Sequence, residues 1–170
     1  SKNPDIKPWI LVSWLKCSTR LAEEKRGTES LIGAIKAFEP NKSFLVSGPW
    51  KNRLREQMLA ARFQLLDIIM KNHSQKEEAW NQINALLAIG DLLDNEQSAK
   101  IYMWAGELAQ GQTQLKAALN FYEKSLAERE TRAAREKYNA VLFTLDKTKV
   151  TAPEASSGRA DLLSEAEGKF

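Results

Sequence analysis

Apolar side chains recur at spacings of three and four residues along most of the chain, which is the period of an amphipathic α-helix. The first such segment runs from Pro8, a residue favoured in the first helical turn, to about Arg26, and Gly27 ends it. Cys17 lies within this segment, so we expect its thiol to be buried. The apolar residues expected on its inward side are Leu11, Trp14, Leu15, Leu21 and Ala22.

The longest helical pattern, residues 50–73, carries two apolar stripes. Leu54 and Met58 belong to one stripe, and Phe63 and Met70 belong to the other. A helix with two apolar stripes is covered by neighbours on two sides. This segment is therefore expected in the middle of a stack of helices.

Apart from a loop expected over 40–49, the remaining residues up to 147 continue the helical pattern, and no segment shows the alternation typical of a strand. Further helices are expected over 29–39, after a capping box at Ser74–Glu77, after Asp94 or Asn95, after Thr113, and over 131–147. The sequence thus predicts one all-α domain, residues 1–147, whose neighbouring helices are antiparallel. Residues 148–170 are rich in small and polar residues, which predicts a tail, within which "RADLLSEAE" could form one or two helical turns.

Residues 99–130 combine small and aromatic side chains at positions where two helices would cross. Gly106, Ala118 and Ser125 are the small residues, and Tyr102 and Tyr122 are the aromatic ones. This set resembles the tetratricopeptide repeat (TPR), a helical hairpin of about 34 residues. The resemblance implies antiparallel hairpins stacked as a short TPR-like solenoid.

The match departs from the TPR motif at several positions. Ala105 and Ala109 stand where bulky residues are usual, and Glu130 stands where proline is common. A second register led by Trp80 places Asn84 where the motif has glycine. An irregular helical bundle is therefore the alternative architecture.

The TPR resemblance also implies where a partner would bind, because the first helix of each hairpin lines a concave surface. In this sequence the matching positions are Lys100, Met103, Glu107, Gln110, Glu136, Asn139 and Phe143. Phe143 also falls outside the apolar stripe of its own helix. The function implied is that of a non-enzymatic scaffold or adaptor for complex assembly, which binds a protein or peptide segment in a helical groove.

Composition and charge give one alternative function. The chain has 170 residues, of which 43% are hydrophobic and 28% are charged, as is usual for a soluble globular protein. Residues 1–75 hold 13 Lys and Arg against 7 Asp and Glu. Lys51, Arg53, Arg55 and Arg62 could contact nucleic-acid phosphates, but charged residues on a helix usually form a solvated face, which is the interpretation we favour.

The sequence contains no recognisable catalytic or cofactor motif. Its one histidine, His73, and one cysteine, Cys17, cannot form a typical zinc or nucleophile site together, and no phosphate-binding glycine loop is present. We therefore expect no enzyme activity, cofactor or metal. No apolar run approaches the ~20 residues of a membrane span. We expect a cytoplasmic protein or, because an anchor could precede Ser1, a membrane-tethered soluble domain.

Overall fold

The computed structural model describes residues 7–23, 28–38, 48–73 and 75–151 of the chain. Within these ranges the secondary structure is helical and no strand occurs, which confirms the all-α class. The elements are, in chain order, α1 (Pro8–Glu23), α2 (Glu29–Phe38), α3 (Lys51–Asn72), α4 (Lys76–Leu87), the 3₁₀ turn η2 (Gly90–Leu92), α5 (Asn95–Gly111), α6 (Leu115–Glu128) and α7 (Arg132–Thr151).

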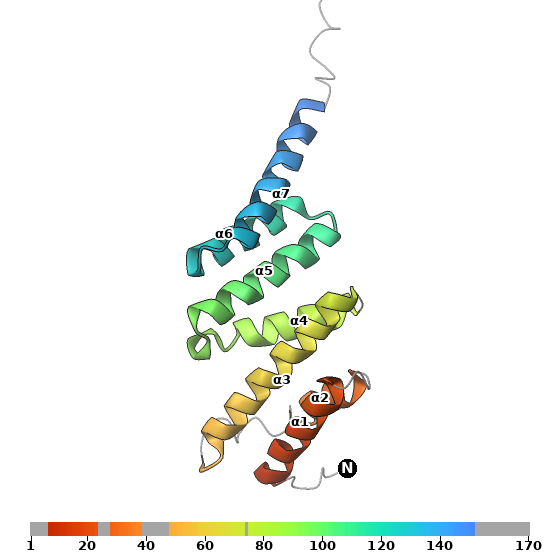
Figure 1. The fold of residues 1–170 in the computed structure, drawn as a ribbon, viewed down its shortest axis with the longest axis vertical. Helices are drawn as coiled ribbons and strands as arrows, with labels where there is room; N and C mark the ends of the chain where they lie inside the picture. The colour runs from red at the N-terminus through yellow and green to blue at the C-terminus, as the bar shows by residue number, and fades with distance from the viewer. Residues whose placement is uncertain (1–6, 24–27, 39–47, 74, 152–170) are drawn as a thin grey trace, which may run out of the picture.

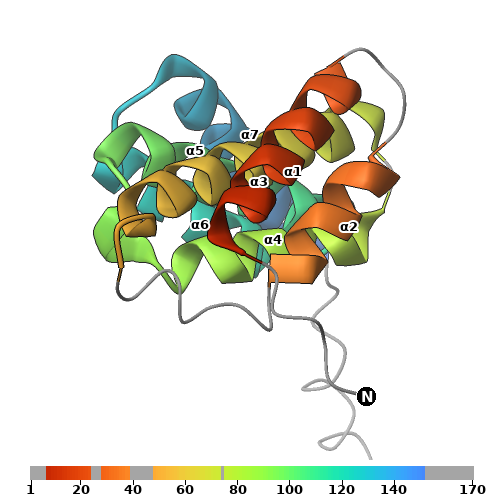
Figure 2. The same ribbon diagram turned by 90° about the horizontal axis from the view of Figure 1, so that it is seen from below.

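The helices are stacked in chain order along the long axis of the molecule, with α1 and α2 at one end and α7 at the other (Figure 1). Each described helix packs mainly on its neighbours in the chain, and α1 also packs on α3. Viewed along the stack, α2, α4 and α6 lie toward one side, and α1, α3, α5 and α7 lie toward the other (Figure 2). The helices therefore form two layers.

Aromatic side chains connect successive helices within each layer. Phe63 of α3 and Trp104 of α5 have ring centroids 6.0 Å apart. Trp80 of α4 and Phe121 of α6 make the equivalent contact in the other layer, at 5.9 Å. Tilted ring pairs at these separations are favourable beyond the area they bury.

The core follows the apolar stripes of the sequence. A large cluster of buried side chains extends from α1 to α5, and a smaller one surrounds Tyr122 between α5, α6 and α7. On α3, Leu54 and Leu65 are fully buried and Phe63 is half-buried against the same cluster. Because α3 packs on α1 and α2 as well as on α4, its two apolar stripes are both covered, as predicted.

The helices α5 and α6 make the most extensive contact of any described pair. The Tyr122 ring lies against the backbone of Gly106, so close that a Cβ atom at residue 106 would be 2.5 Å from its Cε1. The Ser125 hydroxyl donates a buried hydrogen bond of 2.8 Å to the carbonyl oxygen of Ala99. The small and aromatic residues that we expected at a helix crossing therefore form one.

The helix ends agree only partly with the sequence expectations. Asp94, one of the two caps expected for α5, caps this helix, and it does so through a capping box with Gln97. The expected cap at Thr113 is wrong, because this residue is left-handed (φ 60°) and its hydroxyl donates to the adjacent Gln112 carbonyl. Before α4 the capping position is occupied by Gln75, which makes no side-chain capping bond, and Ser74 lies outside the described residues.

The outward face of α1 also differs from expectation. Leu11, Leu15 and Ala22 are buried, whereas Trp14 is 39% exposed and Cys17 is exposed. At 100° per residue, Cys17 falls on the side of the helix away from the buried stripe, and Trp14 falls at the edge of that stripe. The two side chains therefore face solvent.

The last helix continues beyond the expected boundary at residue 147. The described part of α7 ends at Thr151. The remaining tail, 152–170, which includes the expected turns at "RADLLSEAE", lies outside the described residues.

Candidate functional site

A pocket of about 590 Å³ opens between α3, α5 and α7, three helices of the same layer. Its lining residues are Ile69, Met70, His73, Lys76, Glu107, Leu108, Gln110, Gly111 and Lys137. Ile69 and Leu108 are buried, and Met70 is half-buried, so part of the wall is apolar. Apolar walls with a few converging polar groups are typical of binding sites.

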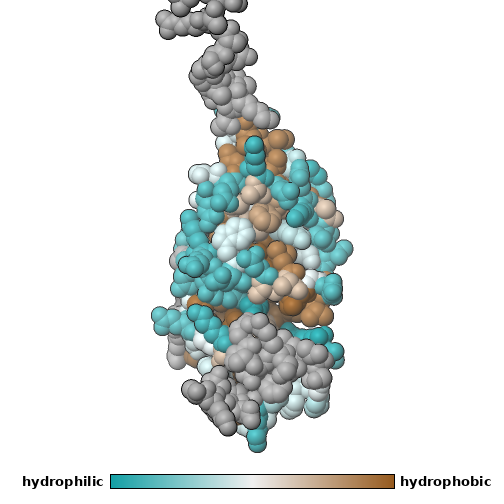
Figure 3. Space-filling view, turned by 180° about the vertical axis from the view of Figure 1, so that it is seen from behind, coloured by the Kyte–Doolittle hydropathy of each residue, from teal (hydrophilic) through white to brown (hydrophobic). Residues whose placement is uncertain are grey.

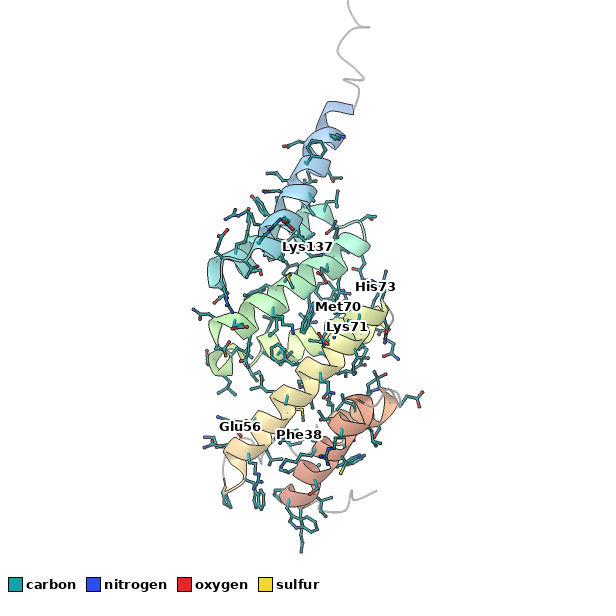
Figure 4. All side chains as sticks on the ribbon, viewed as in Figure 1. Phe38, Glu56, Met70, Lys71, His73 and Lys137 are labelled. Atoms are coloured by element: carbon teal, nitrogen blue, oxygen red, sulfur yellow. The ribbon has the colours of Figure 1, made fainter. Side chains whose placement is uncertain are left out.

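The turn between α3 and α4 brings two of the polar groups to this pocket. His73 ends α3 in a left-handed conformation (φ 50°), and its amide donates to the Met70 carbonyl oxygen at 3.4 Å. Gln75 is also left-handed (φ 52°), and α4 begins directly afterwards at Lys76. Figure 4 shows Met70, Lys71 and His73 near the C-terminal end of α3, and Lys137 on α7.

An ion pair joins the α5 and α7 sides of the pocket. The Lys137 ammonium lies 2.9 Å from Glu107 Oε1, and these side chains are 41% and 27% exposed. A partly exposed pair of this kind contributes only about 0–1 kcal/mol to stability. Lys137 can therefore exchange Glu107 for another carboxylate at little cost.

Tyr122 supports the pocket from behind α5. Its hydroxyl donates to Gln110 Oε1 at 2.9 Å, which fixes the Gln110 side chain. Burial, and secondly the charge of Glu107, raise the pKa of Tyr122 well above its usual value. The hydroxyl therefore remains a donor throughout the physiological pH range.

The residues expected on α5 lie in three places. Glu107 and Gln110 both line the pocket. Lys100 lies on the side toward α3, with its ammonium 3.8 Å from Asp67 Oδ1 and 4.6 Å from the centre of the Trp104 ring. Met103 is half-buried against the smaller core cluster around Tyr122.

The residues expected on α7 lie away from the pocket. Glu136, Asn139 and Phe143 are exposed, and they share the side of α7 opposite the buried Ala134 and Val141. Phe143 is 61% exposed, and hydrophobic side chains reach the surface where α7 extends past the other helices (Figure 3). Of the seven expected residues, the structure thus places only Glu107 and Gln110 in the pocket.

Sequence reasoning missed Lys76 and Lys137 as pocket residues. Lys137 follows Met103 by 34 residues, which is the period of the TPR motif. The sequence register was instead set by Tyr138, 36 residues after Tyr102. A strict period would have identified Lys137 as the α7 residue that faces α5.

Two basic residues of α3 make contacts within the fold that the sequence did not predict. Arg62 is only 8% exposed and donates to Gln82 Oε1 at 2.5 Å. The Arg53 guanidinium lies 5.8 Å from the centre of the Trp50 ring. Arg62 therefore belongs neither to a solvated face nor to a surface that could contact phosphates.

Within the described ranges, no group of three or more His, Cys, Asp or Glu side chains is placed to hold a metal ion. None of the helices in this part of the chain has the length and hydropathy required to cross a membrane. Comparisons with protein-family models, with curated proteins and with solved structures found no match.

Proposed function

We propose that this chain is a non-enzymatic scaffold, built from TPR-like hairpins, that binds a peptide or protein segment in the pocket between α3, α5 and α7. The observation that carries the proposal is the pocket itself, because three helices of one layer and Lys76 at the start of α4 contribute apolar walls and converging polar groups to it. The close crossing of Gly106 and Tyr122 and the two-layer stack support a TPR-like architecture. Such stacks present extended binding surfaces.

The chemistry of the pocket favours a segment with an acidic and an apolar side chain. Lys76 and Lys137 contribute two ammonium groups, against the single carboxylate of Glu107. A ligand carboxylate would accept a charge-assisted hydrogen bond from the Lys137 ammonium group. An apolar ligand side chain would bury itself against Met70 and Leu108, as anchors in peptide grooves do.

A peptide library displayed on phage tests this proposal and does not require the partner to be identified first. We expect selection on the wild-type chain to enrich peptides that combine Asp or Glu with a large apolar residue. The variant Lys137→Glu should weaken their binding about tenfold or more, since it replaces attraction by repulsion, and Lys137→Gln should have a smaller effect. Lys116→Glu on the exposed surface of α6 is the charge-matched control and should bind normally.

Phe143→Glu examines whether the outer face of α7 takes part. Phe143 lies apart from the pocket, so this variant should leave peptide binding unchanged if the pocket alone is the site. Selected peptides that bind Lys137→Glu as tightly as wild type would refute the pocket as the site. Failure to enrich any peptide would count against the function itself.

A further inference from the structure

The outward face of α1 exposes large apolar side chains at the end of the stack opposite α7. Trp9 is 52% exposed, Ile10 is 40% exposed and Trp14 is 39% exposed. The opposite side of α1 is already occupied by its packing on α2 and α3. These three side chains therefore lie outside the core, although tryptophan is usually highly buried.

Positive charge surrounds this apolar face. Lys7, Lys16 and Arg20 are exposed, and the sequence contains no Asp or Glu from residue 7 to residue 22. Lys16 and Arg20 follow Trp9 by seven and eleven residues, which places all three along one edge of the helix. The outward face of α1 is thus both apolar and cationic.

A second pocket, of about 550 Å³, lies beside this face between α1 and α3. Its lining residues are Ser13, Lys16, Cys17, Thr19, Arg20 and Gln57. The two cations converge there with hydroxyl and amide groups and with no carboxylate. This combination suits an anionic oxygen-rich group such as a phosphate.

We infer that the outward face of α1 docks on the surface of an anionic lipid bilayer. Trp9, Ile10 and Trp14 enter the headgroup region, where tryptophan is favoured. Lys16 and Arg20 meet lipid phosphates and carboxylates through the adjacent pocket. The helix lies on the membrane and remains part of the folded stack.

Charge decides in favour of lipid over a second copy of this chain. A symmetric dimer through α1 would place the same surface of both subunits together. Lys16 and Arg20 of each subunit would then approach cations and no acidic partner on this face. An anionic bilayer supplies the complementary charge, and it leaves the pocket between α3, α5 and α7 open because α1 is at the far end (Figure 1).

The single cysteine of the chain provides a reporter at this surface. Cys17 is exposed and lines the α1–α3 pocket, so an environment-sensitive fluorophore attached to it senses the docking face directly. We expect its emission to shift to shorter wavelength with vesicles of phosphatidylcholine in which about a third of the lipid is phosphatidylserine. Vesicles of phosphatidylcholine alone should bind much less, and added salt should weaken binding to the mixed vesicles.

Vesicle co-sedimentation of unlabelled variants separates the contributions of charge and apolar area. Lys16→Gln with Arg20→Gln should weaken binding to the mixed vesicles about thirty-fold, because each cation near such a surface contributes about 1 kcal/mol. Trp9→Ser with Trp14→Ser should weaken it about tenfold. The matched controls, Lys116→Gln with Lys124→Gln and Phe143→Ser, should bind as wild type does.

Several results would overturn the inference. Absence of binding to the mixed vesicles at low salt would do so, and so would equal binding by the α1 variants and the controls. Circular dichroism of each variant shows whether the fold persists, which is expected since the changed side chains are exposed. A lipid-free dimer that Trp9→Ser dissociates, seen by sedimentation, would assign this face to a second copy instead.

Discussion

The contact between Gly106 and Tyr122 allows a severe test of how α5 and α6 pack. Substituting Gly106→Ala adds a Cβ atom that would lie 2.5, 2.7 and 2.9 Å from three ring carbons of Tyr122. Carbon atoms attract best at about 3.5 Å or more, so the ring and the backbone must separate by roughly 1 Å. Tyr122 has no free space to move into, because it is fully buried and its hydroxyl is bonded to Gln110.

Two opposing effects determine how much Gly106→Ala changes the free energy of unfolding. Replacing glycine by alanine within a helix is intrinsically favourable by about 1 kcal/mol. Forcing an extra methyl group into a packed crossing typically costs about 1–3 kcal/mol. The short distances place Gly106→Ala at the upper end of that range, so we expect a net loss of about 2 kcal/mol in the free energy of unfolding.

Urea unfolding followed by far-ultraviolet circular dichroism measures this loss. Gly33→Ala in α2 is the matched control, because nothing lies within 4 Å of a Cβ atom built there. It should stabilise the protein by roughly 0.5–1 kcal/mol, in the opposite direction. Combining Gly106→Ala with Tyr122→Leu should cost less than the sum of the two single changes, since the clashing ring is gone.

Stabilisation of the protein by Gly106→Ala to the same extent as by Gly33→Ala would contradict a close contact between Gly106 and Tyr122. Such a result would mean that α5 and α6 do not approach as closely as described. Additive effects in the double variant would show that Tyr122 is not the group that the added methyl meets.

Three smaller effects are expected at other positions. Because the pKa of Tyr122 is raised in the folded protein, its contribution to stability is complete below about pH 10 and is lost progressively above that pH. Each further pH unit should therefore lower the free energy of unfolding of the wild type by up to about 1.4 kcal/mol more than that of Tyr122→Phe. If urea unfolding at several alkaline pH values gave the two proteins the same pH dependence of the free energy of unfolding, this expectation would be contradicted. Ser125→Ala removes the buried bond to Ala99 and should lower the urea midpoint by an amount equivalent to about 1 kcal/mol; an unchanged midpoint would argue against the bond. Asp94→Ala should cost about 1 kcal/mol and speed hydrogen exchange in the first turn of α5, whereas Asp94→Asn should not.

The sequence predicted most helices well because their apolar periodicity is strong. The segment 50–73 became α3, from Lys51 to Asn72, with both of its stripes covered. Asp94 was one of two caps, with Asn95, expected from their position before an apolar pattern, and it is the residue that caps α5. Both features depend on neighbours in the chain, which a sequence shows directly.

The candidate site was predicted less completely because it depends on how distant helices rotate against each other. Glu107 and Gln110 were identified, but the α7 residue that meets them is Lys137 and not Glu136 or Phe143. A shift of one residue rotates a helix position by 100°, which is enough to move a side chain from a pocket to the outer surface. The spacing of 36 residues between Tyr102 and Tyr138 therefore placed the α7 register two residues away from the one that the strict period gives.

Arg62 shows a second limit of sequence reasoning. Arginine on a helix is usually solvated, and nothing local marked this residue as buried. Its partner Gln82 comes from the next helix and is itself hydrogen-bonded to Glu78 at 2.6 Å. Burial here follows from a polar network across two helices, which periodicity does not reveal.

The stacking of helices in chain order has consequences for how the protein folds and how it unfolds under mechanical force. Contacts between chain neighbours close short loops, so a low contact order and rapid folding are expected. Because each described helix packs mainly on its neighbours in the chain, we expect structure to begin at one neighbouring pair and to extend to the next helix. Tension applied to the two ends would peel helices away one after another, starting from α1 or α7, at low force and without a single cooperative rupture.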